Sequence, residues 1–411
     1  MSDSAPPFSA VAWSDPRREA AFQGWLARVA PAHALRPATL RSASADASFR
    51  RYLRIDGGDH TYIVMDAPPE RERAFHRWLH AVAGPHGLDP SSLRPASADA
   101  SFRRYLRVDG TQGSRIVMDA PPDKEDCRPF VKVAALMADA GLHVPRVLDW
   151  DAPQGFMLLD DLGTQTMIEV VDAAHPPANQ PLYLRAVDAL VAWQLASRPG
   201  VLPPYDEALL ARELALFPDW YLKQHKQLEL SPAQRATLDA QFRLIVQRNL
   251  ASPSVYVHRD FMPRNLMIPR DPAEPRLGVL DFQDAVYGPV TYDIACLMRD
   301  AFLSWDEEFV IDITVRYWEK ALKAGLPVDA DFGDFYRAVE WMGLQRHLKV
   351  AGIFARLTLR DGKPRDLADT PRFIGYIRAT ASRYRELAPL ARLVDEVEGS
   401  DAVSGFAFGR V

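Results

Sequence analysis

The chain has 411 residues, of which 48% are hydrophobic, so it is long and apolar enough for two or three compact units with sizeable cores. Its 49 basic and 54 acidic residues are well mixed and leave a net charge of −5, which argues against a nucleic-acid-binding surface. Cys127 and Cys296 are too few for a disulfide framework or a zinc cluster, which favours a reducing compartment. Charged residues interrupt the stretch from Met1 to Ala30, and no later stretch reaches about 18 apolar residues, so we expect a cytoplasmic protein without a signal peptide or membrane segment.

The front of the chain is duplicated. Residues 17–69, called copy one below, are followed directly by residues 70–122, called copy two. Two pairs of segments are identical letter for letter: 43–54 with 96–107, and 63–69 with 116–122. Two copies are too few for a solenoid, because repeat arrays need about three units to bury a continuous core. The pattern therefore indicates a tandem duplication of part of a domain.

Each copy has the pattern of an amphipathic helix followed by three strands. In copy two, Phe75, Trp78, Leu79 and Val82 recur at helical spacing. Extended runs bounded by turn residues follow this helix. The same order of elements is predicted for copy one.

Only copy two continues into a complete small lobe. A helix is predicted over 130–137, and strands are predicted over 146–150 and 156–159. Residues 70–162 then hold three strands, a crossing helix and two further strands. We expect copy one to lack the crossing helix and the last two strands, and so to have a sheet without an apolar cover. It would dock on the main body, exchange with copy two, pair with another chain or remain partly disordered.

The rest of the chain is mainly helical, with short strands that interrupt it. Apolar residues recur at three-to-four spacing in seven segments: 183–196, 206–217, 232–249, 293–302, 307–323, 334–357 and 372–385. Strands are predicted over 254–258, 266–268 and 277–280. We expect a helical lobe with a small β insert at its face.

The most informative stretch of the sequence lies in this β insert. An apolar run delivers Asp260, Asn265 follows five residues later, and a second apolar run delivers Asp281. This layout suits phosphoryl transfer, in which one carboxylate orients and deprotonates a hydroxyl while an amide and a second carboxylate hold Mg²⁺ against nucleotide phosphates. A solvated loop between two buried strands is the alternative, since Asp and Asn are common turn residues. The correct order and spacing of His-x-Asp-x4-Asn and a strand-borne Asp-Phe favour the site.

These residues resemble the aminoglycoside phosphotransferase and choline kinase branch of the protein-kinase-like fold. Segments 118–122, 155–163, 258–265 and 281–289 are most similar to the anomeric kinases of N-acetylmuramate and N-acetylglucosamine. Those enzymes phosphorylate the C1 hydroxyl of the sugar in bacterial cell-wall recycling. The resemblance covers roughly residues 70–390.

The resemblance implies an α+β, bilobal, protein-kinase-like fold. We expect residues 1–69 to be an N-terminal extension that contains the partial duplicate. Residues 70–162 would be a nucleotide-binding lobe with a five-stranded antiparallel sheet. Residues 163–411 would be a larger, mainly helical lobe that carries the catalytic loop and the sugar site.

Four residues of the β insert receive roles in this prediction. Asp260 is the expected catalytic base, because a carboxylate is ionised at neutral pH and can accept the proton of the sugar hydroxyl. Asn265 and Asp281 are the expected Mg²⁺ ligands, since that metal prefers oxygen donors and is bound by a few protein groups together with phosphate oxygens and water. Arg264 is predicted to meet phosphate or a sugar carboxylate, with a structural ion pair as the alternative.

Two nearby residues are expected to support the loop. His258 precedes Arg-Asp in the motif and is interpreted as a scaffold contact, with a proton shuttle as the alternative. The resemblance implies that Asp293 steadies the catalytic loop by hydrogen bonds. Helix capping is the alternative for Asp293.

Nucleotide binding is less well defined by the sequence. The turn of copy two that corresponds to the phosphate-covering loop of kinases includes Ser101, Phe102 and Arg103, which could donate hydrogen bonds or charge to phosphate oxygens. A plain polar hairpin is the alternative. The third-strand Lys of kinases is absent, since Met118 and Asp119 stand in that region.

The missing Lys leaves its charge to another residue, with Arg103, Arg104 and Lys132 as the candidates. The adenine of ATP is expected near the link between lobes, against Leu158, Asp160 and Leu162. Backbone groups there would supply the donor and acceptor pair.

Substrate recognition is assigned to the helical lobe. Trp220 offers an aromatic face to a pyranose ring, and Arg346 or Lys349 could pair with the lactyl carboxylate of N-acetylmuramate. A core face with a solvated rim is the alternative for these side chains.

The sequence thus predicts an ATP- and Mg²⁺-dependent sugar 1-kinase that acts on small amino sugars, with neither nucleic acid nor membrane as partner. A related kinase of another sugar, an amino alcohol or an aminoglycoside is the first alternative. A catalytically weak nucleotide-binding module is the second. The sequence does not predict the oligomeric state.

Overall fold

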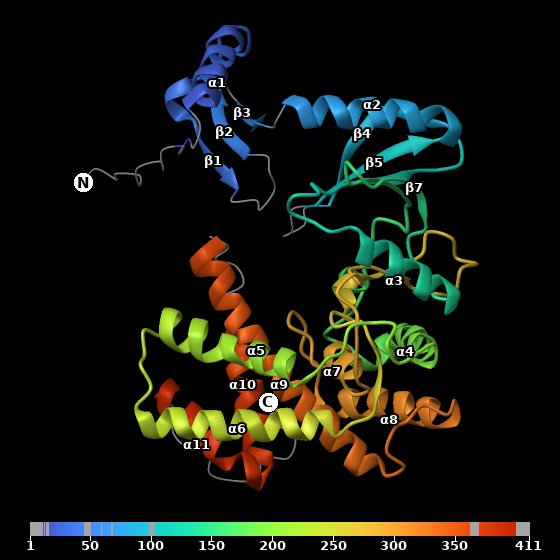
Figure 1. Cartoon of the computed structure of the whole chain (residues 1–411), viewed down its shortest axis with the longest axis vertical. Coiled ribbons are helices and arrows are strands. Elements are labelled where there is room, and N and C mark those ends of the chain that lie inside the picture. Colours follow the sequence, from blue (N-terminus) through green and yellow to red (C-terminus); the bar gives the residue numbers. More distant parts are fainter. Residues whose placement is uncertain are drawn as a thin grey trace. The chain divides into compact units, whose positions relative to one another are not determined.

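A computed structural model gives the fold of the chain (Figure 1). The structure describes residues 11, 13, 16–44, 51–58, 60–66, 69–97, 103–361 and 370–399. Two compact units are present: unit one comprises Met1–Cys127 with Val147–Asp161, and unit two comprises Arg128–Arg146 with Leu162–Val411. Among the described helices, none is both long and apolar enough to span a membrane.

Copy two and the β-hairpin of residues 147–160 form one antiparallel sheet in unit one. Its elements are α2 (Pro69–His86), β4 (Leu88–Ser97), β5 (Arg104–Gly110), β6 (Arg115–Asp119), β7 (Val147–Asp151) and β8 (Phe156–Asp160). The strand order is β4-β5-β6-β8-β7, with every neighbouring pair antiparallel. The prediction of a five-stranded antiparallel sheet is confirmed.

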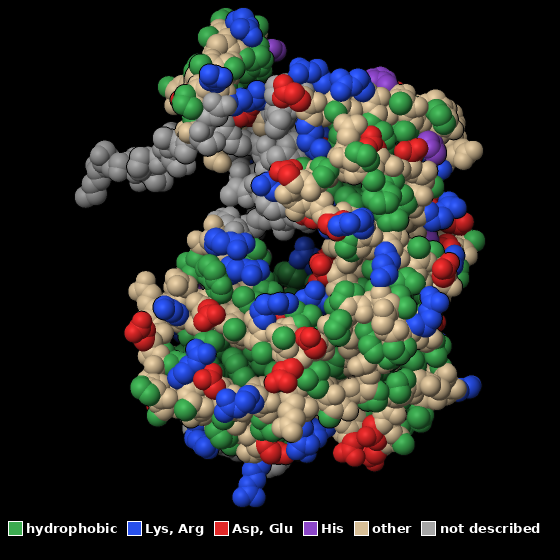
Figure 2. All heavy atoms as spheres, viewed as in Figure 1, with side chains coloured by type: hydrophobic (Ala, Val, Ile, Leu, Met, Phe, Trp, Pro, Cys, Tyr) green, Lys and Arg blue, Asp and Glu red, His purple; other side chains and the backbone are tan. Residues whose placement is uncertain are grey.

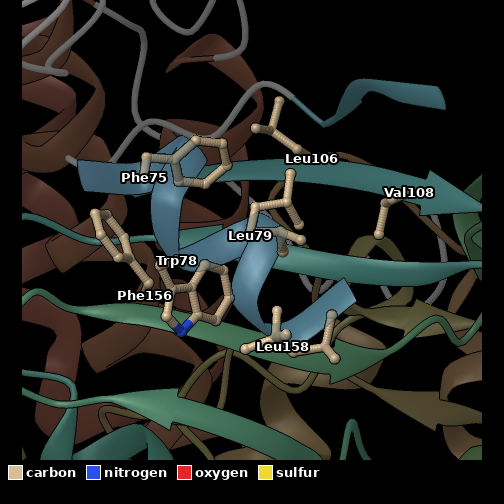
Figure 3. Close-up of a cluster of buried hydrophobic side chains, with 9 residues drawn as sticks. Phe75, Trp78, Leu79, Leu106, Val108, Phe156 and Leu158 are labelled. Atoms are coloured by element: carbon tan, nitrogen blue, oxygen red, sulfur yellow. The ribbon is translucent and has the colours of Figure 1, made fainter. Parts of the chain in front are cut away.

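Helix α2 covers one face of this sheet. Phe75 and Leu79, at helical spacing, are fully buried and pack against strand residues such as Leu106 and Val108 (Figure 3). Phe156 of β8 completes the cluster, because its ring lies 5.5 Å from that of Phe75. Each fully buried side chain of this size contributes about 1.5–3 kcal/mol relative to an exposed one.

Copy one repeats the same arrangement on a smaller scale. Its elements are α1 (Pro16–Val29), β1 (Arg41–Ser44), β2 (Arg51–Gly57) and β3 (His60–Asp66), with the sheet order β1-β2-β3. Phe22 and Leu26 of α1 pack against Leu53, Ile55 and Val64 of the sheet. The expectation that copy one has no apolar cover was therefore wrong. The helix that precedes the strands covers the sheet in both copies, so the crossing helix is not needed for this role.

Polar contacts are duplicated as well. In each copy one arginine of the helix binds the last aspartate of the third strand, and a second arginine–aspartate pair joins the first and second strands. The pairs are Arg18–Asp66 and Arg41–Asp56 in copy one, and Arg71–Asp119 and Arg94–Asp109 in copy two. Both copies therefore have the same local fold, held by equivalent contacts.

Unit two is mainly helical, as predicted. Its helices are α3 (Arg128–Asp139), α4 (Gln180–Leu195), α5 (Glu207–Leu216), α6 (Pro232–Leu250), α7 (Tyr292–Met298), α8 (Glu307–Lys323), α9 (Phe332–Asp361), α10 (Thr370–Arg383) and α11 (Ala388–Glu398). A π-helix, Phe217–His225, continues from α5 and was not predicted. Pro218 at its start lacks a backbone N–H, which removes one regular helical hydrogen bond and favours a change of winding.

Two short strand pairs form the β insert of unit two. β9 (Ser254–Val257) pairs with β12 (Val286–Pro289), and β10 (Leu266–Met267) pairs with β11 (Gly278–Val279), both antiparallel. Basic and acidic side chains are intermixed on the visible surface of each unit (Figure 2). The catalytic-loop motif of the sequence lies between β9 and β10.

Candidate active site

Strand β9 delivers the catalytic-loop motif. Val255, Tyr256 and Val257 are buried, and β-branched and aromatic residues favour an extended backbone. Val257 pairs with Val286 of β12, which fixes the point at which the chain leaves the strand. His258 is the next residue, so the motif begins at the end of a strand that is fixed by pairing with β12.

The structure brings Asp260, Asn265 and Asp281 together. Asn265 ends a 3₁₀ turn, and its side-chain nitrogen donates to the backbone carbonyl of Asp260 at 2.9 Å and to Oδ2 of Asp281 at 3.3 Å. Gln283 donates to the other oxygen of Asp281 at 2.8 Å. Because both bonds of Asn265 use its nitrogen, its side-chain oxygen remains available as an acceptor or ligand.

Two residues of the site have left-handed backbones. Arg259 has φ = 79° and Asp281 has φ = 62°. Non-glycine residues rarely adopt this region, and such strain clusters at functional sites. The strain at Arg259 is held by Asp293, whose Oδ1 accepts the Arg259 N–H at 3.0 Å.

Asp293 lies fully buried beneath the catalytic loop. Its Oδ2 also accepts the backbone N–H of His258, at 2.7 Å. Burial raises the pKa of Asp293 to about 7, although the two backbone donors oppose this shift. The structure shows no side-chain cap at the start of α7, so the loop-steadying interpretation of Asp293 is confirmed over helix capping.

His258 connects the loop to the segment between β11 and Asp281. Its Nε2 lies 3.0 Å from the carbonyl oxygen of Leu280, and its Nδ1 accepts the backbone N–H of Asp260 at 3.2 Å. These contacts require Nε2 to carry the proton. Burial lowers the pKa of His258 to about 4, so the ring is neutral at pH 7. The scaffold role predicted for His258 is confirmed.

A buried charge network anchors Arg259. Its guanidinium lies 2.6 Å from Glu213 of α5, and the ammonium of Lys349 lies 3.0 Å from the same carboxylate oxygen. Burial would raise the pKa of Glu213, but Lys349 and Arg259 hold it below its usual value. Lys349 also donates to the hydroxyl of Tyr292 at 3.2 Å. The ammonium of Lys349, predicted to meet the sugar, is thus buried and paired with protein groups.

Arg346 also lies beneath the loop. It is 2% exposed and donates to the carbonyl of Arg299 at 3.2 Å and to the sulfur of Met262 at 3.8 Å. The guanidinium of Arg264 is exposed and lies 4.6 Å from the ring centroid of Phe302. Trp220 is half-buried on the π-helix Phe217–His225. The contacts with sugar or phosphate predicted for Arg346, Arg264 and Trp220 stay predictions.

Residues 92–330 match the model of the phosphotransferase enzyme family, which covers more than half of the chain. The chain belongs to this family. It is 54% identical over 325 residues to the N-acetylmuramate/N-acetylglucosamine kinase of Pseudomonas aeruginosa, which covers 79% of this chain and 94% of that protein. It is 47% identical over 342 residues to the protein of the same name from Neisseria meningitidis, which covers 82% of this chain and 100% of that protein.

Solved structures of the phosphotransferase family share the fold. One is a putative aminoglycoside phosphotransferase of Ralstonia eutropha JMP134, with a TM-score of 0.52 and 13% identity, over 79% of this chain and 98% of that one. Another is aminoglycoside 2'-phosphotransferase-IIIa in its GDP complex, with a TM-score of 0.53 and 12% identity, over 76% of this chain and 99% of that one. At such identities the likeness confirms the α+β kinase-like fold alone.

The donor set of the site fits a magnesium ion. The side chains of Asn265 and the exposed Asp281 lie next to each other, joined through the amide nitrogen of Asn265, and each has an oxygen that can bind a metal. Within the part of the chain that the structure describes, no three His, Cys, Asp or Glu side chains gather as a metal cluster. Mg²⁺ is usually bound by one or two carboxylates together with phosphate oxygens and water, so this sparse set is appropriate to it.

The nucleotide residues predicted in unit one are partly described. Ser101 and Phe102 lie outside the described residues. Arg103 lies 2.9 Å from Glu125. The side chain of Leu158 is buried in the core beneath α2, and its backbone lies in the sheet between β6 and β7, so the adenine contact predicted for Leu158 stays a prediction. Asp160 ends β8, one residue beyond the predicted strand, and its contact with adenine stays a prediction. Leu162 is buried and belongs to unit two.

In the region of the third strand where kinases have a Lys, this chain has a buried cluster of charged side chains around Asp119. Asp119 is fully buried, and its two carboxylate oxygens accept from Arg71 at 3.0 Å and from Arg104 at 2.9 Å. Arg104 is therefore committed to Asp119. Lys132 donates to the carbonyl of Val201 and belongs to unit two.

Sequence reasoning missed Glu213, which joins Arg259 and Lys349 under the loop. No local signal identified it, because its partners lie far along the chain and α5 reads as an ordinary amphipathic helix. A buried Glu on the apolar face of a helix was the single hint.

Proposed function

We propose that the protein is an ATP- and Mg²⁺-dependent kinase that phosphorylates the C1 hydroxyl of N-acetylmuramate and N-acetylglucosamine. The observation that carries the proposal is the extent of its likeness to kinases of that name, one of them 54% identical over 94% of its own length. The arrangement of Asp260, Asn265 and Asp281 supports the same conclusion, because it has the parts that phosphoryl transfer needs.

The reaction follows from the roles of these residues. The C1 oxygen of the sugar forms a bond to the γ-phosphorus of ATP, the bond from that phosphorus to the β,γ-bridging oxygen breaks, and ADP leaves. Asp260 accepts the proton of the C1 hydroxyl. Mg²⁺ held by Asn265 and Asp281 would neutralise charge on the phosphate oxygens.

The surrounding residues keep Asp260 in place. His258 binds its backbone N–H, Asn265 binds its carbonyl, and Asp293 holds the two residues before it. Hydrogen bonds therefore fix the backbone on both sides of the proposed base. Positioning of this kind lowers the barrier, since a reacting group displaced by about 1 Å can cost about 10²-fold in rate.

The buried cluster around Asp119 favours the alternative function, that of a catalytically weak nucleotide-binding module. Without the third-strand Lys, the phosphates must be met by other cations or by backbone N–H groups. The intact loop from His258 to Asn265 favours an enzyme over this module.

The test is ADP release by the full chain with Mg²⁺, ATP and a panel of sugars. We expect turnover with N-acetylglucosamine and N-acetylmuramate. The methyl glycoside of N-acetylglucosamine should give none, because its C1 oxygen carries a methyl group in place of the proton. Equal turnover with the glycoside would place the phosphate elsewhere on the sugar, and turnover only with amino alcohols or aminoglycosides would favour the alternative kinase.

A further inference from the structure

The third strand of copy one ends a sheet, whereas its counterpart in copy two does not. β6 pairs along its whole length with β8, from Arg115 opposite Asp160 to Asp119 opposite Phe156. Within the described residues, β3 pairs only with β2. An edge strand presents backbone N–H and C=O groups that can accept a further strand.

The edge strand β3 shares its sequence with β6, the strand with which β8 pairs. Residues 63–66 of β3 are identical to residues 116–119 of β6. A strand paired with β3 in the register of β6 would place Leu158 opposite Val64, as it now lies opposite Val117. Ile63 of β3 is 53% exposed.

Copy one also keeps the side chains that fix the end of β8. Asp161, which follows β8, accepts from Arg107 at 2.7 Å and from Ser114 at 2.6 Å. The residues at the corresponding positions of copy one are Arg54 and Thr61. Arg54 is exposed, and its guanidinium has no carboxylate partner among the described residues.

The aromatic contacts of β8 have counterparts too. In copy two, Phe156 lies 5.5 Å from the ring of Trp78, which is 8% exposed. The equivalent tryptophan of copy one, Trp25, is 38% exposed. Phe22 is covered by Trp13, whose ring lies 5.0 Å away. Copy one therefore has an open strand edge, equivalent donor side chains for the Asp161 carboxylate in Arg54 and Thr61, and a partly exposed tryptophan in Trp25.

We propose that copy one is a second acceptor for the β-hairpin of residues 147–160, which exchanges between β6 and β3 of the same chain. The exchange conserves the number of strand pairs and replaces the contacts of Asp161 and Phe156 with equivalent ones. Copy two would then have the open edge that copy one has now. Connectivity allows this, because copy two is an insertion between β3 and the rest of the chain and keeps α2 and its own three strands.

The same chain is favoured over a second copy as the donor of the hairpin. A tethered segment meets its acceptor at an effective concentration of about millimolar, without the entropic cost of association. Opening of two strands is a local unfolding event, which proteins undergo on the microsecond-to-second timescale.

Disulfide trapping in the full chain tests the exchange. The variant V117C/L158C reports pairing with β6, and the matched variant V64C/L158C reports pairing with β3. Directly opposed residues of antiparallel strands have Cα atoms about 4.5–5.5 Å apart, which suits a disulfide. Native Cys127 and Cys296 are buried, and peptide mapping after oxidation with oxidised glutathione identifies the joined residues.

We expect both variants to form the disulfide within a monomer, with V64C/L158C the slower, because trapping accumulates even a minor conformer. A disulfide in V117C/L158C alone would overturn the proposal. A V64C/L158C disulfide found only between chains would also overturn it, since the hairpin would then come from a second copy.

Hydrogen exchange provides a measurement that does not depend on new cysteines. The full-chain variant R107A/S114A loses the Asp161 contacts of copy two, so residues 60–66 should become more protected and residues 115–119 less protected. The matched variant R54A/T61A should not show this transfer of protection. Unchanged protection of residues 60–66 in R107A/S114A would contradict the exchange, whatever the cysteine variants show.

Discussion

The side-chain nitrogen of Asn265 donates to a carboxylate oxygen of Asp281 across 3.3 Å. The two residues come from different segments, one at the end of a 3₁₀ turn and one two residues after β11. Because this contact uses the amide nitrogen of Asn265, the amide oxygen remains available to a metal. The contact also fixes the spacing of the two expected metal ligands. The pairing of β10 with β11 holds both segments, so the ligand pair depends on two short strands.

Replacement of Asp260 by Asn should lower turnover at least about 10²-fold, the usual range for the loss of a general acid or base. ATP binding should persist, because the expected metal ligands remain. Steady-state kinetics and nucleotide binding measure the two effects, with the surface variant Asp239→Asn of α6 as control. Near-normal turnover in Asp260→Asn would remove this residue from the role of base.

Replacement of Asp281 by Ala should abolish Mg²⁺-dependent nucleotide binding and turnover, because the phosphates lose the ion that bridges them to the protein. Calorimetric titration of ATP with and without Mg²⁺ measures this effect. Asp239→Ala should bind as the unmodified protein does. If Asp281→Ala keeps its Mg²⁺ dependence, the metal is held by other residues.

Burial of His258 should make the stability of the protein depend on pH. Because its pKa falls from 6.5 to about 4 on folding, the unfolded chain binds more protons between these values. The contribution of the neutral ring is complete above pH 6.5 and is lost as the pH falls toward 4, by up to about 3 kcal/mol. Asp293, whose pKa is raised to about 7, acts in the opposite direction and is present in all variants compared.

Urea unfolding at several pH values between 4 and 7 measures this dependence. His258→Gln should have a smaller loss of unfolding free energy on acidification than the unmodified protein. His80→Gln, at an exposed position of α2, should behave as the unmodified protein does. Parallel pH profiles for His258→Gln and the unmodified protein would show that the buried imidazole does not titrate as proposed.

A chain that lacks residues 1–69 should fold and keep its activity. Copy two alone pairs with β8 and provides the complete five-stranded sheet. Turnover and thermal midpoint of the truncated and full chains measure the effect. The paired substitutions Asp99→Ala with Ser101→Ala should reduce turnover more than Asp46→Ala with Ser48→Ala. An inactive truncated chain, or a larger effect of the copy-one substitutions, would mean that copy one supplies the working nucleotide loop or an essential contact.

Local patterns predicted much of this protein. The strand before His258, the spacing of Asp260 and Asn265, and most helices of unit two were evident, because each depends on residues close together in the sequence. Helix α11 and the π-helix Phe217–His225 were not predicted. The duplication gave the order of elements in both copies. These features follow from periodicity and strand-end placement.

Contacts between distant residues could not be predicted in the same way. The network of Glu213 with Arg259 and Lys349 joins helix α5, the loop after β9 and helix α9. The pairing of Asp119 with Arg71 and Arg104 depends on how α2 lies on its sheet. The prediction that no helix covers the sheet of copy one was wrong for the same reason. Its apolar helix was evident, but the face on which it packs is set by the fold.

The position of the transferred phosphate tests the central claim most directly. The full chain is incubated with ATP, Mg²⁺ and N-acetylglucosamine, and the product is examined by phosphorus NMR with correlation to the sugar protons, with Asp260→Asn as the matched control. The proposed function predicts one new phosphate signal coupled to the proton on C1, strongly reduced in Asp260→Asn. Phosphate on another sugar carbon, or no phosphate transfer by the unmodified protein, would contradict it.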